Sequence, residues 1–379
     1  MRYYIVAGER SGDLHASNLM KSLLNEDEQA EFRFWGGDAM QAVGGTMVKH
    51  YRETAFMGIW EVITNLRKIF GFIKECKEDI LHYQPDAVIL VDYAAFNMRI
   101  AKFIKKQGFS FPVYYYISPK VWAWNTQRAY KIKANVDKMF VIFPFEVDFY
   151  QGFDYRVDYV GNPLLDAIQA FSPNKQFREE NDLPLEKPLI ALLPGSRKQE
   201  VTKILDKMLI IRKEFPAYHF VIAGVSNLPK EFYEPFARLE SVSIIYDQTY
   251  DLLSQAEAAL VTSGTATLET ALFGVPQVVV YKTSALTFWV GKLLIKVPYI
   301  SLVNLVADKE AVRELIQKDF NPVSLQNELQ AILRGGEKRS QILADYAELK
   351  LKMGEPGASE KAGKLMWRYL KGKESELMQ

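Results

Sequence analysis

Short apolar runs recur along the chain, each followed by a polar turn and then an amphipathic stretch. The clearest runs are 87–91 in the first half and 258–261 and 277–281 in the second. Apolar runs of this length, bounded by turn residues, predict buried parallel strands, and apolar residues three and four apart predict the helices between them. This alternation of strand, turn and helix is typical of doubly wound α/β domains.

The pattern falls into two halves. Segment 167–188 is polar and carries prolines, which marks a boundary. We therefore predict two Rossmann-like domains, 1–168 and 169–379, with a helical tail at about 345–379 that is free to pack back on the first domain. Two such halves without a dinucleotide fingerprint, with a Ser-Gly-Thr helix start at 263–265 in the second half, suggest the B-type glycosyltransferase (GT-B) architecture. The expected strands are 2–7, 32–35, 47–50, 86–91, 113–117, 138–143, 189–193, 218–223, 242–246, 258–261 and 277–281.

The stretch from Thr262 to Pro276 is the strongest candidate for a ligand site. A buried strand leads into Ser263-Gly264-Thr265, a helical pattern follows, and Gly274 and Pro276 end that helix. A helix that begins at the carboxyl end of a strand presents free N–H groups and the positive end of its dipole. Gly264 lets a phosphate approach, and hydroxyl groups can add donors. A capped helix of any α/β domain would show the same features. The residues expected to bind there are Ser263, Gly264, Thr265, Thr267 and Glu269.

Polar turns follow other predicted strands. Arg197 follows the strand 189–193 in a Gly-Ser turn and is expected to clamp a phosphate. In the first half, Glu9 and Ser11 follow the first strand and are expected to face a ligand cleft, whereas Asp13 suits a helix cap. Asp92 follows the strand 86–91, where it is placed for general-base work, although a helix cap is the alternative. Trp122 and Trp124 follow another strand and are expected to line an acyl or sugar site.

Composition narrows the functional class. The 379 residues are 49% apolar and 25% charged, with a net charge of +1, which predicts a globular protein without a field that favours nucleic acid. One cysteine, Cys76, and four histidines without ligand spacing predict no metal or other cofactor.

No signal peptide or membrane-spanning run is evident, so a cytoplasmic location is expected. The aromatic and basic stretches 56–74 and 286–299 suit either core packing or a membrane surface.

Seven motifs together resemble the lipid-A-disaccharide synthase family, and the match covers nearly the whole chain in the right order. The resemblance implies an inverting, peripheral-membrane GT-B enzyme of the inner membrane. Its substrates would be UDP-2,3-diacylglucosamine and 2,3-diacylglucosamine 1-phosphate (lipid X), and its products a β-1,6-linked disaccharide and UDP. The motifs are Ala7–Asp13, Asp92–Asn97, Ser118–Trp124, Gly161–Leu164, Pro194–Arg197, Ser263–Glu269 and Val297–Asn304.

The resemblance also assigns roles and shows departures. Asn304 matches a family position at the active cleft and is expected to orient the sugar or phosphate. Asn97, which ends the Asp92–Asn97 motif, is expected to bind substrate. The family's Asp-Ala-Pro-Asp-Phe-Asn loop reads Asp-Tyr-Ala-Ala-Phe-Asn here, so its second acid is missing. That leaves Asp92 as the expected base, with Glu9 as its rival. The family's histidine in Gly-His-Pro is often replaced, and here the residue is Asn162, so this position cannot supply a histidine base. A UDP-sugar 2-epimerase and a non-catalytic glycolipid binder remain alternatives, and the oligomeric state, including a homodimer, stays open.

Overall fold

The computed structural model describes residues 1–379 except 55–65, 197, 227, 285–287, 290–296 and 373–379. The chain forms two compact units: Met1–Asp166 together with Glu355–Gln379, and Ala167–Gly354. It passes from the first unit to the second within α10 (Pro163–Ala170) and returns after Gly354. The predicted tail is therefore divided, because helix α19 (Arg339–Met353) stays with the second unit and α20 (Ala358–Leu370) joins the first.

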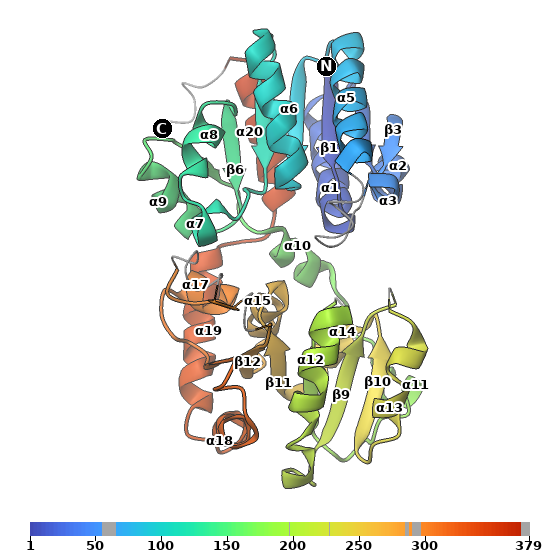
Figure 1. Ribbon diagram of the computed structural model, residues 1–379, viewed down its shortest axis with the longest axis vertical. Coiled ribbons are helices and arrows are strands. Elements are labelled where there is room, and N and C mark those ends of the chain that lie inside the picture. The colour runs from blue at the N-terminus through green and yellow to red at the C-terminus, as the bar shows by residue number, and fades with distance from the viewer. Residues whose placement is uncertain (55–65, 197, 227, 285–287, 290–296, 373–379) are drawn as a thin grey trace. The chain divides into compact units, whose positions relative to one another are not determined.

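The described residues of the first unit contain a seven-stranded sheet whose strand pairs are all parallel (Figure 1). Its order is β3-β2-β1-β4-β5-β6-β7. The strands are β1 (Arg2–Ala7), β2 (Glu31–Gly36), β3 (Thr46–His50), β4 (Ala87–Val91), β5 (Val113–Tyr116), β6 (Lys138–Val141) and β7 (Asp158–Tyr159). Besides α20 and α10, its helices are α1 (Arg10–Glu26), α2 (Asp38–Val43), α3 (Tyr51–Thr54), α5 (Leu66–Tyr83), α6 (Ala94–Gln107), α7 (Val121–Trp124), α8 (Arg128–Lys133) and α9 (Phe145–Gln151).

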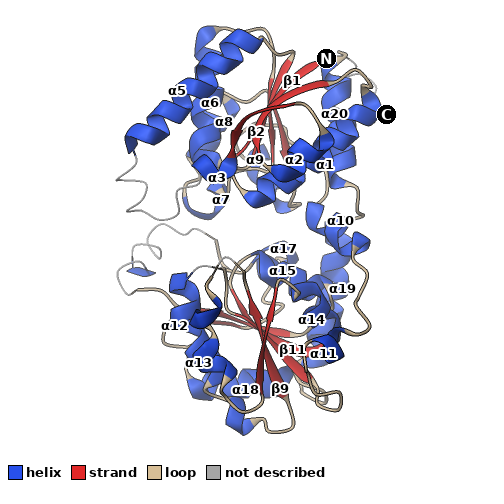
Figure 2. Ribbon diagram, turned by 90° about the vertical axis from the view of Figure 1, so that its right-hand side faces the viewer, coloured by secondary structure: helices blue, strands red, loops and turns tan. Residues whose placement is uncertain are grey.

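Helices cover both faces of this sheet, which explains why every residue of β4 is buried (Figure 2). Side chains of a strand alternate between faces, so consecutive tyrosines of β5 enter different cores. Tyr115 packs in the core that contains α5 and α6 residues. Tyr114 and Tyr116 pack in the opposite core, with residues of α1 and α20. The C-terminal helix thus completes one face of the first sheet.

The second unit repeats this architecture with a six-stranded parallel sheet in its described residues, in the order β10-β9-β8-β11-β12-β13. The strands are β8 (Leu189–Leu193), β9 (His219–Gly224), β10 (Val242–Tyr246), β11 (Ala256–Thr262), β12 (Gln277–Tyr281) and β13 (Glu314–Ile316). Its helices, with two short 3-10 turns, are α11 (Phe177–Glu180), α12 (Lys198–Leu209), η1 (Arg212–Glu214), η2 (Lys230–Phe232), α13 (Glu234–Ala237), α14 (Thr249–Gln255), α15 (Thr265–Leu272), α17 (Leu302–Ala307), α18 (Pro322–Ile332) and α19.

The predicted strands are confirmed, and the structure adds two short ones. Strand β7 has two residues and β13 has three, too few to show a hydrophobic period. The predicted end of α15 is also confirmed: Gly274 has a φ of 74°, and the N–H of Val275 donates to the carbonyl of Thr270 at 3.1 Å. None of the helices in the described ranges is both long and apolar enough to cross a membrane.

Candidate active site

Three charged residues of the first unit follow neighbouring strands at the carboxyl edge of its sheet. Glu9 follows β1, Asp92 follows β4, and Lys120 comes after β5, and these strands lie side by side in the order β1-β4-β5. Ligands of open parallel sheets bind at this edge. The sheet therefore brings the predicted base and its rival to one place and adds a cation that the sequence did not single out.

Asp92 sits in an environment that disfavours its charge. Burial raises its pKa, the negative charge of Glu9 raises it further, and Lys120 and the N–H of Tyr93 oppose that rise. Glu9 itself is exposed. A carboxylate with a raised pKa is a better proton acceptor than an ordinary surface aspartate, which suits a general base.

The turn after β1 contributes Ser11 and Asp13 in different ways. Ser11 is exposed on the first turn of α1, two residues after Glu9 in the chain. Asp13 is buried, and its carboxylate accepts the N–H groups of Gly37, Ala39 and Met40 at 2.7 to 3.1 Å. It therefore acts as the expected helix cap, but for α2 and not for its own helix.

Asn97 has a structural role in the described fold, and its predicted substrate contact stays a prediction. Its side chain is completely buried. The amide nitrogen donates to the carbonyl of Asp92 at 2.8 Å and, with longer contacts, to those of Val91 and Val6 at 3.2 and 3.3 Å. Asn97 thus joins the carboxyl ends of β1 and β4 underneath the edge where Glu9 and Asp92 lie.

Trp122 packs in the core of the first unit, and its predicted place in an acyl or sugar site stays a prediction. It is 6% exposed, and its indole N–H donates to Glu146 Oε1 at 3.1 Å. The other oxygen of Glu146 accepts the N–H groups of Ile142 and Phe143 at 3.2 and 3.0 Å. Burial raises the pKa of Glu146 to about 7. For Trp124, the side chain lies outside the described part.

In the second unit, the turn after β11 is open toward a ligand. Gly264 is the residue before α15 and, as a glycine, has no side chain to cap this helix; the N–H of Thr267 donates to the carbonyl of Gly264 at 3.3 Å. A Cβ added to Gly264 would meet only the carbonyl oxygen of Thr262, at 3.9 Å. Thr265 is exposed beside it. Ser263, by contrast, donates its hydroxyl to the carbonyl of Ile300 at 2.7 Å.

The two remaining predicted residues of this helix, Thr267 and Glu269, differ in solvent exposure. Thr267 is completely buried, and its hydroxyl donates to the carbonyl of Gly264 at 2.8 Å, which stabilises the first turn of the helix. Glu269 is partly exposed and accepts the hydroxyl of Tyr250 at 3.1 Å. Burial raises the pKa of Glu269, and the bond from Tyr250 opposes that rise. Tyr250 is a neighbour that no sequence motif indicated.

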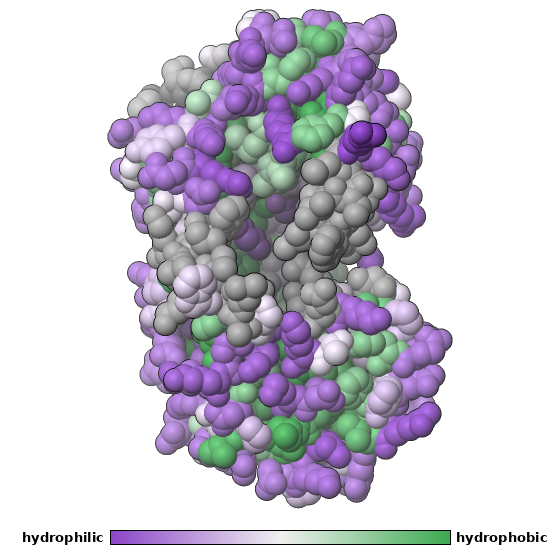
Figure 3. Space-filling model, in the orientation of Figure 1, coloured by the Kyte–Doolittle hydropathy of each residue, from purple (hydrophilic) through white to green (hydrophobic). Residues whose placement is uncertain are grey.

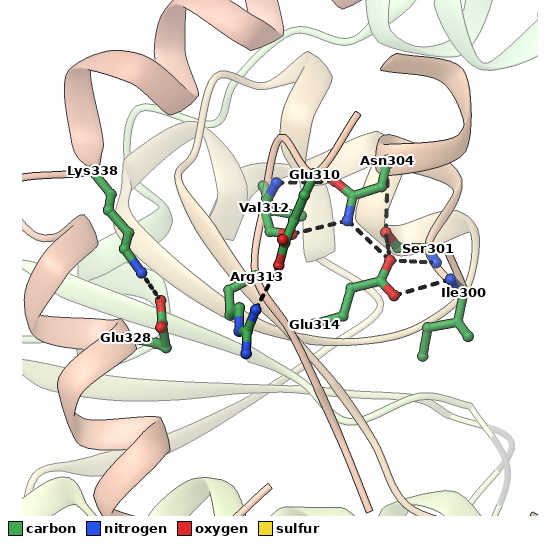
Figure 4. Close-up of polar contacts among 9 residues, drawn as sticks. All are labelled: Ile300, Ser301, Asn304, Glu310, Val312, Arg313, Glu314, Glu328 and Lys338. Carbon is green, nitrogen blue, oxygen red and sulfur yellow. Dashed lines mark hydrogen bonds and ion pairs between the residues drawn. The ribbon is translucent and has the colours of Figure 1, made fainter. Parts of the chain in front are cut away.

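Asn304 belongs to a polar cluster that holds the start of α17 (Figure 4). It is completely buried; its amide exchanges hydrogen bonds with the backbone of Val312 and donates to Glu314 at 3.0 Å. Glu314 also accepts the N–H groups of Ile300 and Ser301, at 3.0 and 2.9 Å, and the Ser301 hydroxyl. The amide of Asn304 thus stabilises the start of α17, and its predicted substrate contact stays a prediction. Glu314, which the sequence analysis missed, is the centre of this cluster.

Several predictions fall on residues that are not described. Arg197 lies outside the described residues, as do 55–65 and most of 285–296, which include much of both aromatic and basic stretches. Among the residues that are described, no group of three or more His, Cys, Asp or Glu side chains is arranged to hold a metal ion.

Comparison with known proteins decides the family. Residues 3–366 match the family described as lipid-A-disaccharide synthetase. The chain belongs to the lipid-A-disaccharide synthase family. One family member, from Syntrophus aciditrophicus, is 39% identical over 374 residues, which is 97% of each chain. Another, from Coxiella burnetii, is 34% identical over 366 residues, or 96% of each chain.

Solved structures agree with the predicted fold. The UDP-GlcNAc 2-epimerase from Neisseria meningitidis bound to UDP-GlcNAc has a TM-score of 0.67 and 14% identity, covering 97% of this chain and all of that one. The glycosyltransferase of kitacinnamycin has a TM-score of 0.67 and 13% identity, covering 97% of this chain and 99% of that one. The GT-B fold is confirmed. As a member of the lipid-A-disaccharide synthase family, the chain is a glycosyltransferase of lipid A biosynthesis.

Proposed function

We propose that the enzyme transfers the sugar of UDP-2,3-diacylglucosamine to the 6-hydroxyl of 2,3-diacylglucosamine 1-phosphate (lipid X). The products are the β-1,6-linked lipid A disaccharide 1-phosphate and UDP. The observation that carries this proposal is the environment of Asp92, a largely buried carboxyl with a raised pKa at the carboxyl edge of its sheet, in a chain of this family.

Asp92 acts as the general base in this proposal. It takes the proton of the acceptor 6-hydroxyl while the oxygen attacks the anomeric carbon of the donor from the face opposite UDP, so the configuration inverts. One C–O bond forms, the bond between the anomeric carbon and the diphosphate breaks, and the bonding electrons leave with UDP. Glu9 is the alternative base, and the exposed Ser11 is placed to bind the acceptor.

The second unit holds the leaving group. The N-terminal end of α15 and the open side of Gly264 suit a diphosphate, since a helix N-terminus stabilises negative charge. Thr265 is positioned to add a hydroxyl donor, and Glu269 to accept from the ribose hydroxyls. Arg197 would supply the cationic clamp expected from its position in the Gly-Ser turn after the strand 189–193.

The direct test is release of UDP from purified enzyme with each acylated sugar alone and with both together. We expect release only when both are present. Release or isomerisation with the UDP-sugar alone would point to epimerase-like chemistry, and binding without any turnover would point to a glycolipid binder. Either result would exclude the proposed transfer.

We further propose that the enzyme works in the cytoplasm, on the surface of the inner membrane. The outer side of α5 and α6 carries the exposed bases Arg67, Lys68, Lys74 and Lys102. Phe70 is 55% exposed there, with the guanidinium of Arg99 5.1 Å from its ring centroid. Figure 3 shows hydrophilic and apolar side chains mixed over these two helices. Such a surface suits anionic headgroups.

Flotation with vesicles that contain phosphatidylglycerol tests this surface. Phe70→Asp should reduce the bound fraction, because it removes an apolar anchor and adds a negative charge. Val323→Asp, at a 67% exposed position of the second unit, is the matched control. Equal binding of both variants would exclude α5 and α6 as the membrane surface. Sedimentation of the same samples without vesicles tests the homodimer that the sequence leaves open.

A further inference from the structure

The backbone around Asp92 has an unfavourable conformation. Asp92 and Tyr93 both have a φ of 46°, in the left-handed region that residues with a Cβ rarely adopt. Neither residue is a glycine, and they are consecutive. Strain of this kind persists only where the surroundings hold it, and it gathers at functional sites.

Two buried side chains hold this turn from below. The hydroxyl of Tyr115 donates to the carbonyl oxygen of Asp92, and the amide of Asn97 donates to the same oxygen at 2.8 Å. The N–H of Asp92 is fixed as well, since it donates to the carbonyl of Tyr116 at 3.0 Å. Tyr115 and Asn97 are both completely buried, so water does not compete for these bonds. The Asp92 peptide is therefore held on both sides.

Tyr93, the second residue of the turn, is held by the contacts of its ring. A Cβ built on Gly8 would lie 2.2 Å from this ring, so the ring covers the glycine of the β1–α1 turn closely. The ring also stacks on Phe96, with centroids 5.3 Å apart. The groups that face the Asp92 carboxylate come from separate elements: Glu9 from the turn after β1 and Lys120 from the segment after β5. A shift of the turn would change the distance of the carboxylate from both.

We propose that Tyr115 and Asn97 are positioning residues for the reaction: by binding the Asp92 carbonyl they hold the strained turn that presents the Asp92 carboxylate at the sheet edge. This inference rests on the proposed function, in which Asp92 is the base. Burial and the charge of Asp92 raise the pKa of Tyr115, so its hydroxyl stays protonated and remains a donor.

Strand β5 offers a matched control. Tyr116 is the next residue, is equally buried, and places its hydroxyl 3.2 Å from Ser359 Oγ on the opposite face of the sheet. Tyr115→Phe and Tyr116→Phe therefore remove the same atom from the same strand, at the same depth. Only the first of them removes a bond to Asp92.

The experiment compares UDP release, UDP affinity and the unfolding midpoint of the full-length variants. Tyr115→Phe should lower kcat by about ten- to a hundredfold, the range expected for a displaced catalytic group, and leave the Kd for UDP unchanged. Tyr116→Phe should keep a kcat close to that of the original enzyme. Because a loosened turn lets water reach Asp92, the acid limb of the pH–rate profile should move to lower pH in Tyr115→Phe only.

Asn97→Ala provides a second variant with the same expected pattern. The inference is overturned if Tyr115→Phe keeps full kcat, or if both tyrosine variants lose activity equally. It is also overturned if neither Tyr115→Phe nor Asn97→Ala folds, because the two residues would then be structural only. If the original enzyme releases no UDP from the two acylated sugars, the proposed function fails instead, so the two failures are distinguishable.

Discussion

Asp92 shows how one side chain acquires reactivity from its surroundings. Its raised pKa has burial as its main cause, and two charges on neighbouring strand ends act on it in opposite directions, Glu9 raising it and Lys120 lowering it. Both charges are exposed, so their effects are screened by salt and are best measured at low ionic strength. Substitutions of Asp92, Glu9 and Lys120 should therefore have different effects on turnover and on its pH dependence.

Replacing Asp92 with alanine should reduce turnover by at least about a hundredfold, since general-base catalysis contributes about that much. UDP affinity should stay unchanged, because the candidate diphosphate cradle belongs to the second unit. Single-turnover UDP release and calorimetric UDP binding measure the two quantities. Equal turnover in Asp92→Ala and the original enzyme would rule out Asp92 as the base.

Charge removal at Glu9 and Lys120 should move the acid limb of the pH–rate profile in opposite directions. A base must be deprotonated, so activity is lost as the pH falls through its pKa. Lys120→Met removes a charge that lowers the pKa of Asp92, so the limb should move to higher pH; Glu9→Gln removes one that raises it, so the limb should move to lower pH. If Glu9→Gln instead abolishes turnover, Glu9 is the base.

The strand–turn–helix junctions of the two units look alike in sequence but use their glycines differently. At Gly8 a Cβ would lie 2.2 Å from the ring of Tyr93, whereas at Gly264 it would meet nothing closer than 3.9 Å. The first glycine is therefore needed for packing inside the protein. The second leaves space on the side where a ligand would approach.

Two alanine substitutions test this difference. Gly8→Ala should lower the free energy of unfolding by about 1–3 kcal/mol, the usual cost of overpacking. Gly264→Ala should leave the free energy of unfolding unchanged or raise it slightly, because the backbone of Gly264 is extended and a Cβ there has room. The same substitution should weaken UDP binding by about tenfold, or about 1.4 kcal/mol. Denaturant titration and calorimetry measure these effects. Unimpaired UDP binding by Gly264→Ala would exclude this turn as the cradle.

Glu146 links the segments that follow β5 and β6, and its burial should make stability depend on pH. Burial raises its pKa from 4.5 to about 7 in the folded protein. Between these values the folded state holds more protons than the unfolded state, so stability falls as the pH rises through this window. Glu146→Gln should remove this pH-dependent change in the free energy of unfolding, which is on the order of 1–3 kcal/mol. Unfolding midpoints of both proteins from pH 5 to pH 8 provide the comparison, and parallel curves would contradict it.

Sequence patterns predicted the elements well because their causes are local. Period, strand length and turn residues specify β1, β4, β11 and α15 without reference to the rest of the chain. The roles of single polar side chains depend on what long-range packing places beside them. Asn97, Thr267 and Asn304 belong to the predicted site motifs, yet each forms hydrogen bonds with nearby backbone, and Asn304 also bonds the Glu314 side chain. No sequence pattern distinguished Tyr115 or Glu314. Tyr115 is one of three consecutive tyrosines in β5, and Glu314 lies in a strand of only three residues.

The whole molecule is built from two units, of which only the second is continuous in sequence. Helix α20 packs on α1: the hydroxyl of Ser22 donates to the carbonyl of Glu360 at 3.1 Å, and Gly363 lies against Ser22. The buried side chains Ala362 and Met366 belong to the same core as Leu19 of α1. The stability of the first unit therefore depends on residues from both ends of the chain.

Gly363→Val should destabilise the first unit alone, by about 1–3 kcal/mol, because a Cβ at this position would lie 2.2 Å from Ser22 Oγ and 2.8 Å from Ser22 Cβ. In calorimetry, the unfolding transition of the first unit should move to lower temperature. The transition of the second unit, whose midpoint UDP should raise, should stay at the same temperature. Gly71→Ala in α5, where a Cβ has no neighbour within 4 Å, is the control. A simultaneous shift of both transitions would show that the units unfold together.

The return of the chain to its first unit also sets the timing of biosynthesis. The last helix of that unit is encoded after residue 354, so the whole second unit must be translated before α20 can meet α1. At about 5–20 residues per second, the intervening segment takes on the order of ten to forty seconds to synthesise. During that interval the nascent first sheet lacks the helix that covers part of one face. Apolar side chains such as Leu19 and Tyr116 are then accessible to chaperones, and the second unit has the opportunity to finish folding first.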